Sequence, residues 1–140
     1  MGRVLAIDYG QKRVGLAVTD ELQMIATGLQ TIHSKDIISF LTTYLKHEIV
    51  DCFVVGLPVN LRNELSDSAR FTEPFVKLLQ KKFPGIPVER IDERFTSKMA
   101  SAAILQSGAK KKDRRDKSLI DKVSAIIILQ TYLEMKASVL

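Results

Sequence analysis

The pattern of apolar positions opens with two runs of strand length. Arg3–Tyr9 and Arg13–Thr19 are joined by a three-residue connection that begins with Gly10, and this length and glycine content are typical of a β-hairpin. A third β-prone segment runs from Met24 to Ile32 and is interrupted by Gly28. We therefore expect the chain to begin with three strands, of which the first two pair antiparallel.

Helical spacing follows. Apolar residues recur three and four positions apart up to about His47, and Ser34 is suited to cap the helix that they predict. Val50–Gly56 is then apolar without polar alternation, as expected of a parallel strand that is covered on both faces. The order strand, helix, strand therefore continues directly from the opening hairpin.

A second helix is predicted up to Phe83. Pro74 lies within it and removes the backbone bond to Arg70, so the helix should either bend there or begin late, with Thr72 as cap and Pro74 in its first turn. The next strand is expected at Ile86–Ile91.

Two further helices complete the pattern. Thr96 or Ser97 is suited to cap the first of them, which Gly108 would stop, and Ser118 to about Met135 predicts a long final helix with a broad apolar face. The whole order favours an α/β fold with a mixed sheet and helices on both faces, in a single domain spanning residues 1–140.

The lengths of the apolar stretches, the N-terminal residues and the single cysteine indicate the compartment in which the protein is expected to work. The longest apolar stretches fall far short of the roughly 20 residues that a membrane span requires, and the N-terminus lacks the pattern of a signal peptide. The single cysteine, Cys52, lies in an apolar run and suits a reducing compartment. We expect a cytoplasmic protein with no membrane association.

The charge pattern points to an anionic partner. The net charge is +5, and six cations fall within eight residues of a loop that lacks apolar periodicity. Such a loop is either a solvated connection or a surface that neutralises nucleic-acid phosphates. Its cations are Lys110, Lys111, Lys112, Arg114, Arg115 and Lys117, and Lys12, Arg13 and Arg94 are candidates to extend the same surface.

Acidic residues stand at three places where a catalytic site could form. Asp8 ends the first strand, Asp92 and Glu93 follow the strand that starts at Ile86, and Asp121 lies in the first turns of the last helix. If the two strands run the same way in nearby positions of the sheet, these acids meet at its carboxyl edge. Clustered carboxylates repel one another unless a hard divalent cation neutralises them, and the absence of paired cysteines disfavours zinc.

Each acid also has a structural interpretation. Asp8 is suited to start the turn at Gly10, and Asp92 with Glu93 to lie in a solvated loop beside Arg94. Asp121 stands three residues after Ser118, the spacing of a helix capping box. His33 and His47 do not form a catalytic set with a serine and an acid in the sequence.

The motifs together resemble the YqgF family over nearly the whole chain. The residues that carry the resemblance are Ala6–Gly10, Arg13–Ala17, Val54–Pro58, Asp92–Ser97, and Ile120–Asp121 with Ala125 and Ile128–Gln130. Two features depart from the family pattern. Asn60–Glu64 contains no glycine where a glycine-containing loop is expected, and Pro74 is unusual.

The resemblance implies an RNase H-like fold with a mixed five-stranded sheet and a bacterial nuclease activity. The substrate it implies is structured nucleic acid, either the 5′ end of pre-16S rRNA, on ribosomal particles, or a Holliday junction. By motif, Asp8, Glu93 and Asp121 take the catalytic, metal-binding acid positions, with Asp92 as the alternative to Glu93. Two Mg²⁺ or Mn²⁺ ions would then support in-line attack of water on a phosphodiester.

Rival functions are distinguishable. Actin-like ATPases and sugar kinases place an aspartate in a similar hairpin, but they require two such domains and a second phosphate loop, which 140 residues do not supply. A non-catalytic nucleic-acid-binding module would keep the basic surface without cleavage. Junction resolution normally requires a two-fold dimer, and the sequence leaves monomer and homodimer open.

Overall fold

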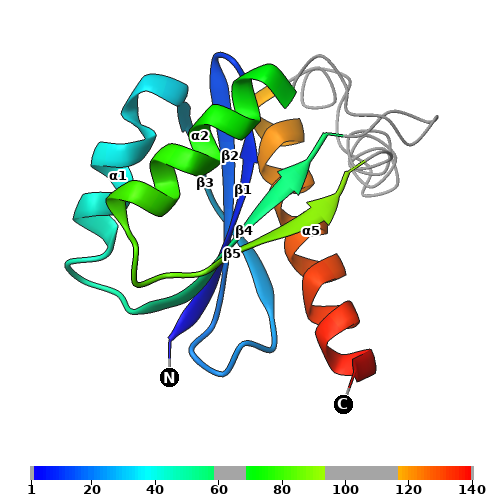
Figure 1. The fold of residues 1–140 in the computed structure, drawn as a ribbon. Helices are drawn as coiled ribbons and strands as arrows, with labels where there is room; N and C mark the ends of the chain where they lie inside the picture. Colours follow the sequence, from blue (N-terminus) through cyan, green and yellow to red (C-terminus); the bar gives the residue numbers. More distant parts are fainter. Residues whose placement is uncertain (1, 59–68, 94–116, 140) are drawn as a thin grey trace.

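A computed structural model describes residues 2–58, 69–93 and 117–139 (Figure 1). A five-stranded mixed sheet in the order β3-β2-β1-β4-β5 forms its centre. The strands are β1 (Arg3–Tyr9), β2 (Arg13–Thr19), β3 (Ala26–His33), β4 (Val50–Leu57) and β5 (Val88–Asp92). The helices are η1 (Ser34–Asp36), α1 (Ile37–Tyr44), α2 (Ala69–Lys82) and α5 (Lys117–Val139).

Both faces of the sheet are covered, as the apolar pattern predicts. Figure 1 shows α1 and α2 on one face and α5 on the other. Because side chains alternate along a strand, β1 sends Leu5 and Ile7 into the core under α1 and α2, and Val4 and Ala6 into the core under α5. The two cores hold the sheet between helices, so its carboxyl edge is left to form a site.

The opening hairpin and third strand confirm the sequence prediction. β1 and β2 pair antiparallel over the predicted residues, and the Gly10 N–H donates to the Arg13 carbonyl to close the turn. β3 runs through Gly28 without ending, because a register shift opposite Leu16 and Ala17 absorbs one residue. Gly28 therefore interrupts the pairing pattern but not the strand.

The predicted cap of the first helix is wrong. Ser34 lies in the short helix η1, and α1 begins at Ile37 with Asp36 in the cap position and no side-chain cap bond. The Ser34 hydroxyl instead donates to the Gln11 carbonyl at 2.7 Å, and its N–H donates to the Lys12 carbonyl. Ser34 thus braces the tip of the hairpin, a long-range role that local capping rules do not reveal.

The second helix keeps Pro74 in its interior. α2 already includes Ala69, so a late start with Thr72 as cap is wrong, and Thr72 is a buried helical residue. The predicted helix after Thr96, most of the basic loop and the glycine-free loop Asn60–Glu64 lie outside the described residues. Among the helices that are described, none is both long and apolar enough to cross a membrane.

The topology satisfies the condition for bringing the predicted acids together. β1 pairs parallel with β4, and β4 pairs parallel with β5, so β1 and β5 run the same way with one strand between them. Their carboxyl ends therefore lie at the same edge of the sheet. Neighbouring strands are about 4.8 Å apart, so an acid after β5 must reach across β4 to meet Asp8.

Candidate active site

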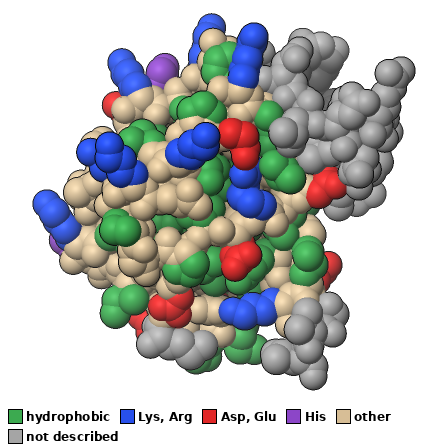
Figure 2. All heavy atoms as spheres, viewed as in Figure 1, with side chains coloured by type: hydrophobic (Ala, Val, Ile, Leu, Met, Phe, Trp, Pro, Cys, Tyr) green, Lys and Arg blue, Asp and Glu red, His purple; other side chains and the backbone are tan. Residues whose placement is uncertain are grey.

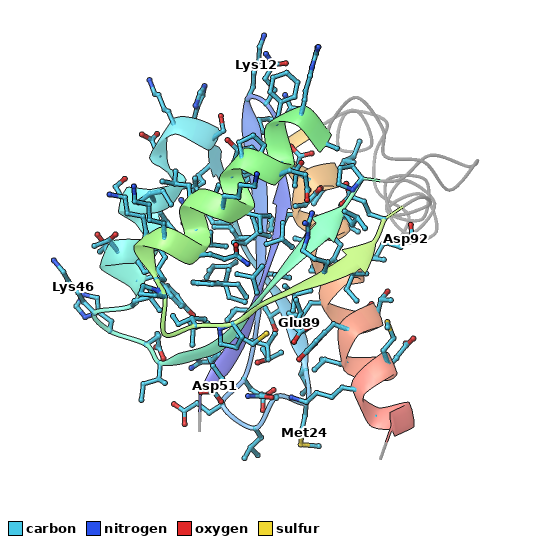
Figure 3. All side chains as sticks on the ribbon, in the orientation of Figure 1. Lys12, Met24, Lys46, Asp51, Glu89 and Asp92 are labelled. Atoms are coloured by element: carbon cyan, nitrogen blue, oxygen red, sulfur yellow. The ribbon has the colours of Figure 1, made fainter. Side chains whose placement is uncertain are left out.

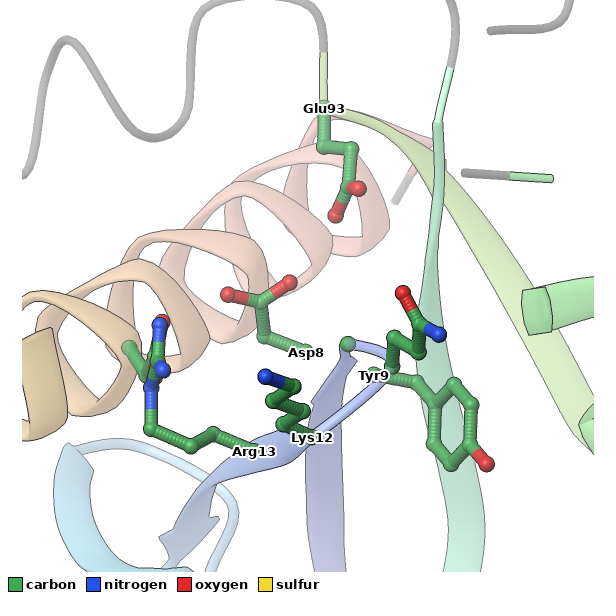
Figure 4. Close-up of a pocket in the computed structure, with 8 residues that line it drawn as sticks. Asp8, Tyr9, Lys12, Arg13 and Glu93 are labelled. Carbon is green, nitrogen blue, oxygen red and sulfur yellow. The ribbon is translucent and has the colours of Figure 1, made fainter. Parts of the chain in front are cut away.

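A pocket of about 360 Å³ opens at the carboxyl edge of the sheet, next to the hairpin tip. It is lined by Asp8, Tyr9, Gly10, Gln11, Lys12, Arg13, Glu93 and Asp121. Figure 4 shows Asp8 between Glu93 on one side and Lys12 and Arg13 on the other. All three acids predicted from the sequence thus line one pocket, together with two cations.

Strand alternation explains why these side chains share a face. Asp8 is two residues beyond Ala6, and Glu93 is two residues beyond Ile91, and both Ala6 and Ile91 pack in the core under α5. Asp92, between Ile91 and Glu93, is exposed instead. The structure therefore places Glu93 rather than Asp92 beside Asp8.

Two glycines bring the acids close together. Gly15 on β2 is the cross-strand partner of Asp8, and a Cβ on Gly15 would overlap the backbone carbonyl of Asp121. The absence of a side chain at Gly15 lets the first turns of α5 approach the sheet backbone, as glycine in a strand often does. Asp121 is thereby carried to the side of Asp8.

Gly56 performs the same function for Glu93. It lies on β4, the strand that separates β1 from β5, and a Cβ there would overlap the Glu93 carboxylate. The Glu93 N–H donates to the Leu57 carbonyl at 3.1 Å, which fixes its backbone at the end of β4. The side chain then reaches across Gly56 toward Asp8.

Asp121 is held by a cation. Its Oδ2 accepts a hydrogen bond from Arg13 Nε at 2.7 Å. α5 begins at Lys117, so Ser118 lies inside the helix and the capping-box interpretation of Asp121 is wrong. The acid faces the pocket and Arg13 rather than the end of its own helix.

The electrostatics of Asp8 and Glu93 are strongly perturbed. Desolvation, followed by the charge of Asp121, raises the pKa of Asp8 from 3.8 to about 7, although a hydrogen bond with Glu93 acts in the opposite direction. Desolvation and the charge of Asp8 raise the pKa of Glu93 from 4.5 to about 8. The two carboxyls therefore resist simultaneous ionisation unless a cation compensates them.

The donor set suits a hard divalent cation, because it offers only carboxylate oxygens whose mutual repulsion a cation would relieve. Within the described ranges, however, no three His, Cys, Asp or Glu side chains are grouped closely enough to enclose a metal ion as they stand. Asp121 is engaged with Arg13 instead. The three carboxylates are suitable ligands for a divalent metal ion, but Asp121 would have to release Arg13 before it could bind one.

Comparison with known proteins identifies the family. The sequence profile of RuvX, described as a Holliday junction resolvase, matches residues 2–135. The chain belongs to the RuvX family. The resemblance to the YqgF family seen in the sequence is thus confirmed.

Relatives of this RuvX-family chain have a different descriptive name. A protein of Bacteroides fragilis named "Putative pre-16S rRNA nuclease" is 50% identical over 136 residues, which cover 97% of this chain and 99% of the relative. A protein of Christiangramia forsetii with the same name is 53% identical over 133 residues, covering 95% and 98%.

The fold of this RuvX-family chain is RNase H-like, as the sequence resemblance implied. Its three-dimensional structure is similar to that of Thermus thermophilus RuvC solved in complex with a Holliday junction substrate. The TM-score is 0.56 at 20% identity, with 96% of each chain covered. At this level of identity the likeness supports the fold alone.

The predicted nucleic-acid-binding residues of the RuvX-family chain are only partly described. Lys12 is exposed at the hairpin tip and Arg13 is half-buried beside it. Figure 3 labels Lys12 at this end of the molecule, where Figure 2 shows Lys and Arg side chains on the surface. Lys117 begins α5. The remaining residues, Arg94, Lys110, Lys111, Lys112, Arg114 and Arg115, lie outside the described residues.

Residues that build the site were missed in the sequence. Gly15 and Gly56 stand inside strands, where a glycine is a sequence signal for the close approach of another backbone or side chain. Arg90 was missed as well. It forms a two-point ion pair with Glu73 of α2 at 2.7 Å and donates to the Gly56 carbonyl, so it ties α2 to β4 at the glycine beside the Glu93 carboxylate.

Proposed function

We propose that this RuvX-family chain is a nuclease that hydrolyses phosphodiester bonds in structured nucleic acid. The activity that we favour is processing of the 5′ end of pre-16S rRNA during ribosome biogenesis. The observation that carries the proposal is the pocket itself, in which Asp8, Glu93 and Asp121 gather beside Lys12 and Arg13 at the carboxyl edge of the sheet. The names of relatives about 50% identical over nearly their full length support the choice of RNA.

Asp8 is the central acid of the proposed mechanism. It lies between Glu93, with which it shares a hydrogen bond, and Asp121, whose negative charge raises the pKa of Asp8. These three residues would hold one or two Mg²⁺ or Mn²⁺ ions, which when bound supply a Lewis acid that activates water and stabilises the leaving oxygen. The protein contributes the backbone support for the carboxylates, since Asp8 lies in β1, Asp121 lies in α5, and Glu93 directly follows β5.

Lys12 and Arg13 are proposed to bind the phosphate backbone. Both line the pocket and lie across Asp8 from Glu93 (Figure 4), and contacts from such cations to phosphates fix the orientation of a nucleic acid without reading its bases. Binding should therefore weaken steeply with salt, by a slope close to the number of phosphates neutralised.

The second candidate is resolution of Holliday junctions, because the family description names that activity. Two coordinated cuts would normally require a two-fold dimer. The test compares a 5′-extended precursor 16S rRNA fragment with a four-way DNA junction, each with Mg²⁺ or Mn²⁺, using the full chain and the Asp8→Asn variant.

We expect cleavage of the precursor RNA that Asp8→Asn abolishes while binding is largely retained. Paired symmetric cuts in the junction, without RNA cleavage, would instead favour the resolvase. Binding to either substrate without any Asp8-dependent cleavage, under all metals and pH values tried, would support a non-catalytic binding module and reject the nuclease.

A further inference from the structure

The contact between Arg13 and Asp121 links the two chemically different halves of the pocket. Arg13 belongs to the cationic wall at the start of β2, and Asp121 belongs to the acids on α5. Their side chains meet at 2.7 Å and are 41% and 21% exposed, respectively. The contact therefore occupies one carboxylate oxygen of Asp121, a proposed metal ligand, and the Nε–H of Arg13, a proposed phosphate ligand.

The two partners of this contact differ in how far they can move. Asp121 cannot shift toward the sheet, because its carbonyl already lies where a Cβ of Gly15 would be. Arg13 has a long side chain that is partly exposed at the end of a strand. Any exchange of partners at Asp121 is thus expected to move the Arg13 side chain rather than the helix.

We propose that Arg13 is an exchangeable counterion: it neutralises Asp121 in the metal-free protein, leaves when a divalent cation binds the three acids, and then contacts a substrate phosphate. This inference rests on the proposed function. It explains why the three acids line one pocket and yet do not enclose a metal site among the described residues. The exchange would couple metal binding to phosphate binding. A metal ion at Asp121 frees Arg13 for a phosphate, and a phosphate at Arg13 frees Asp121 for the metal ion.

The exchange has a modest free-energy cost. Breaking an ion pair with this exposure should weaken the binding of a competing cation by no more than about fivefold. A divalent cation held by three carboxylates is a far stronger competitor for Asp121 than one guanidinium, because it brings twice the charge to all three acids at once. Arg13 can therefore satisfy Asp121 without blocking the site.

Nuclear magnetic resonance tests the exchange directly in the full chain. The Arg13 Nε–H signal, identified by its absence in Arg13→Gln, is followed during Mg²⁺ titration, and calorimetry measures Mg²⁺ binding to the same protein. We expect the signal to move toward the position of a solvated arginine with the midpoint found by calorimetry. In Asp8→Asn, which lacks the central acid, Mg²⁺ should leave the signal in place.

The Arg13→Gln variant supplies an independent measurement, with Lys12→Gln as matched control. Both remove one positive charge from the same pocket wall, but in the described residues only Arg13 is bonded to Asp121. We expect Arg13→Gln to bind Mg²⁺ about two- to fivefold more tightly than the wild type, and Lys12→Gln to change binding less.

The outcomes separate this inference from the proposed function. Mg²⁺ binding with an unmoved Arg13 signal, or weaker binding in Arg13→Gln, would overturn the exchange and leave the nuclease proposal intact. Exchange without nucleic-acid cleavage would reject the nuclease and retain the exchange. Absence of Mg²⁺ binding in the wild type and in Arg13→Gln alike would overturn both.

Discussion

Replacing Asp8 by asparagine should stabilise the metal-free protein while it destroys the proposed activity. Asp8 is desolvated next to Asp121, so the folded state disfavours its charge and raises its pKa from 3.8 to about 7. Below the pKa of Asp8 in the unfolded chain, the raised pKa does not lower the stability of the fold. Between that pH and the pKa in the folded state, the loss of stability grows with pH, and above it the loss is constant. An uncharged asparagine of nearly the same shape avoids this cost.

The magnitude follows from the pKa values. A change from 3.8 to about 7 corresponds to at most about 4 kcal/mol above neutral pH, at about 1.4 kcal/mol per factor of ten. Part of this is not recovered, because the asparagine amide is also desolvated at this position. We expect a gain of about 2 kcal/mol at about pH 8, or roughly 5–10 °C in Tm for a chain of this size.

The assay is thermal and urea unfolding of wild type and Asp8→Asn in chelator-containing buffer, between about pH 4 and pH 8. The advantage of the variant should be close to zero at the acid end and should grow to its full value near pH 8. Adding Mg²⁺ should raise the Tm of the wild type more than that of the variant, because only the wild type retains all three acids.

Two results would refute this reasoning. An Asp8→Asn variant that is less stable than the wild type at about pH 8 would mean that the Asp8 carboxylate is stabilised by its surroundings. A stability difference that does not change between the two pH limits would mean that the effect of the substitution is not electrostatic.

Three further predictions concern the residues around Asp8. Gly56→Ala should displace the Glu93 carboxylate and lower the cleavage rate by about 100-fold, with an unchanged circular dichroism spectrum. Gly85→Ala serves as control and should keep the wild-type rate, because a Cβ added at Gly85 meets nothing within 4 Å. Glu93→Gln should nearly abolish cleavage in a single-turnover assay and Asp92→Asn should retain it within about twofold, since only Glu93 lines the pocket; equal losses would contradict this assignment. Arg90→Met should lower the free energy of unfolding by about 2 kcal/mol in urea, because it removes the hydrogen bonds that Arg90 donates to the Glu73 carboxylate and to the Val55 and Gly56 carbonyls, and an unchanged midpoint would count against that role.

The sequence predicted most of the fold because local patterns determined it. Alternating or continuous apolar runs marked all five strands, and β1 and β2 have the predicted bounds. The errors fall where a distant contact outweighs a local preference. Ser34 is a good capping residue, but it bonds to Gln11 across the hairpin tip, and Thr72 is a good cap that lies buried within α2.

The sequence by itself selected Asp8, Asp121 and the neighbouring pair Asp92 and Glu93 as candidate acids, because they stand in motifs that end or follow a strand or lie in the first turns of a helix. Only the tertiary structure decided how they meet. The parallel order β1-β4-β5 leaves one strand between Asp8 and Glu93, and Gly15 and Gly56 leave the space that lets Asp121 and Glu93 reach Asp8. Spacing along the chain contains no information on such clearances, since they depend on which backbone packs over a strand.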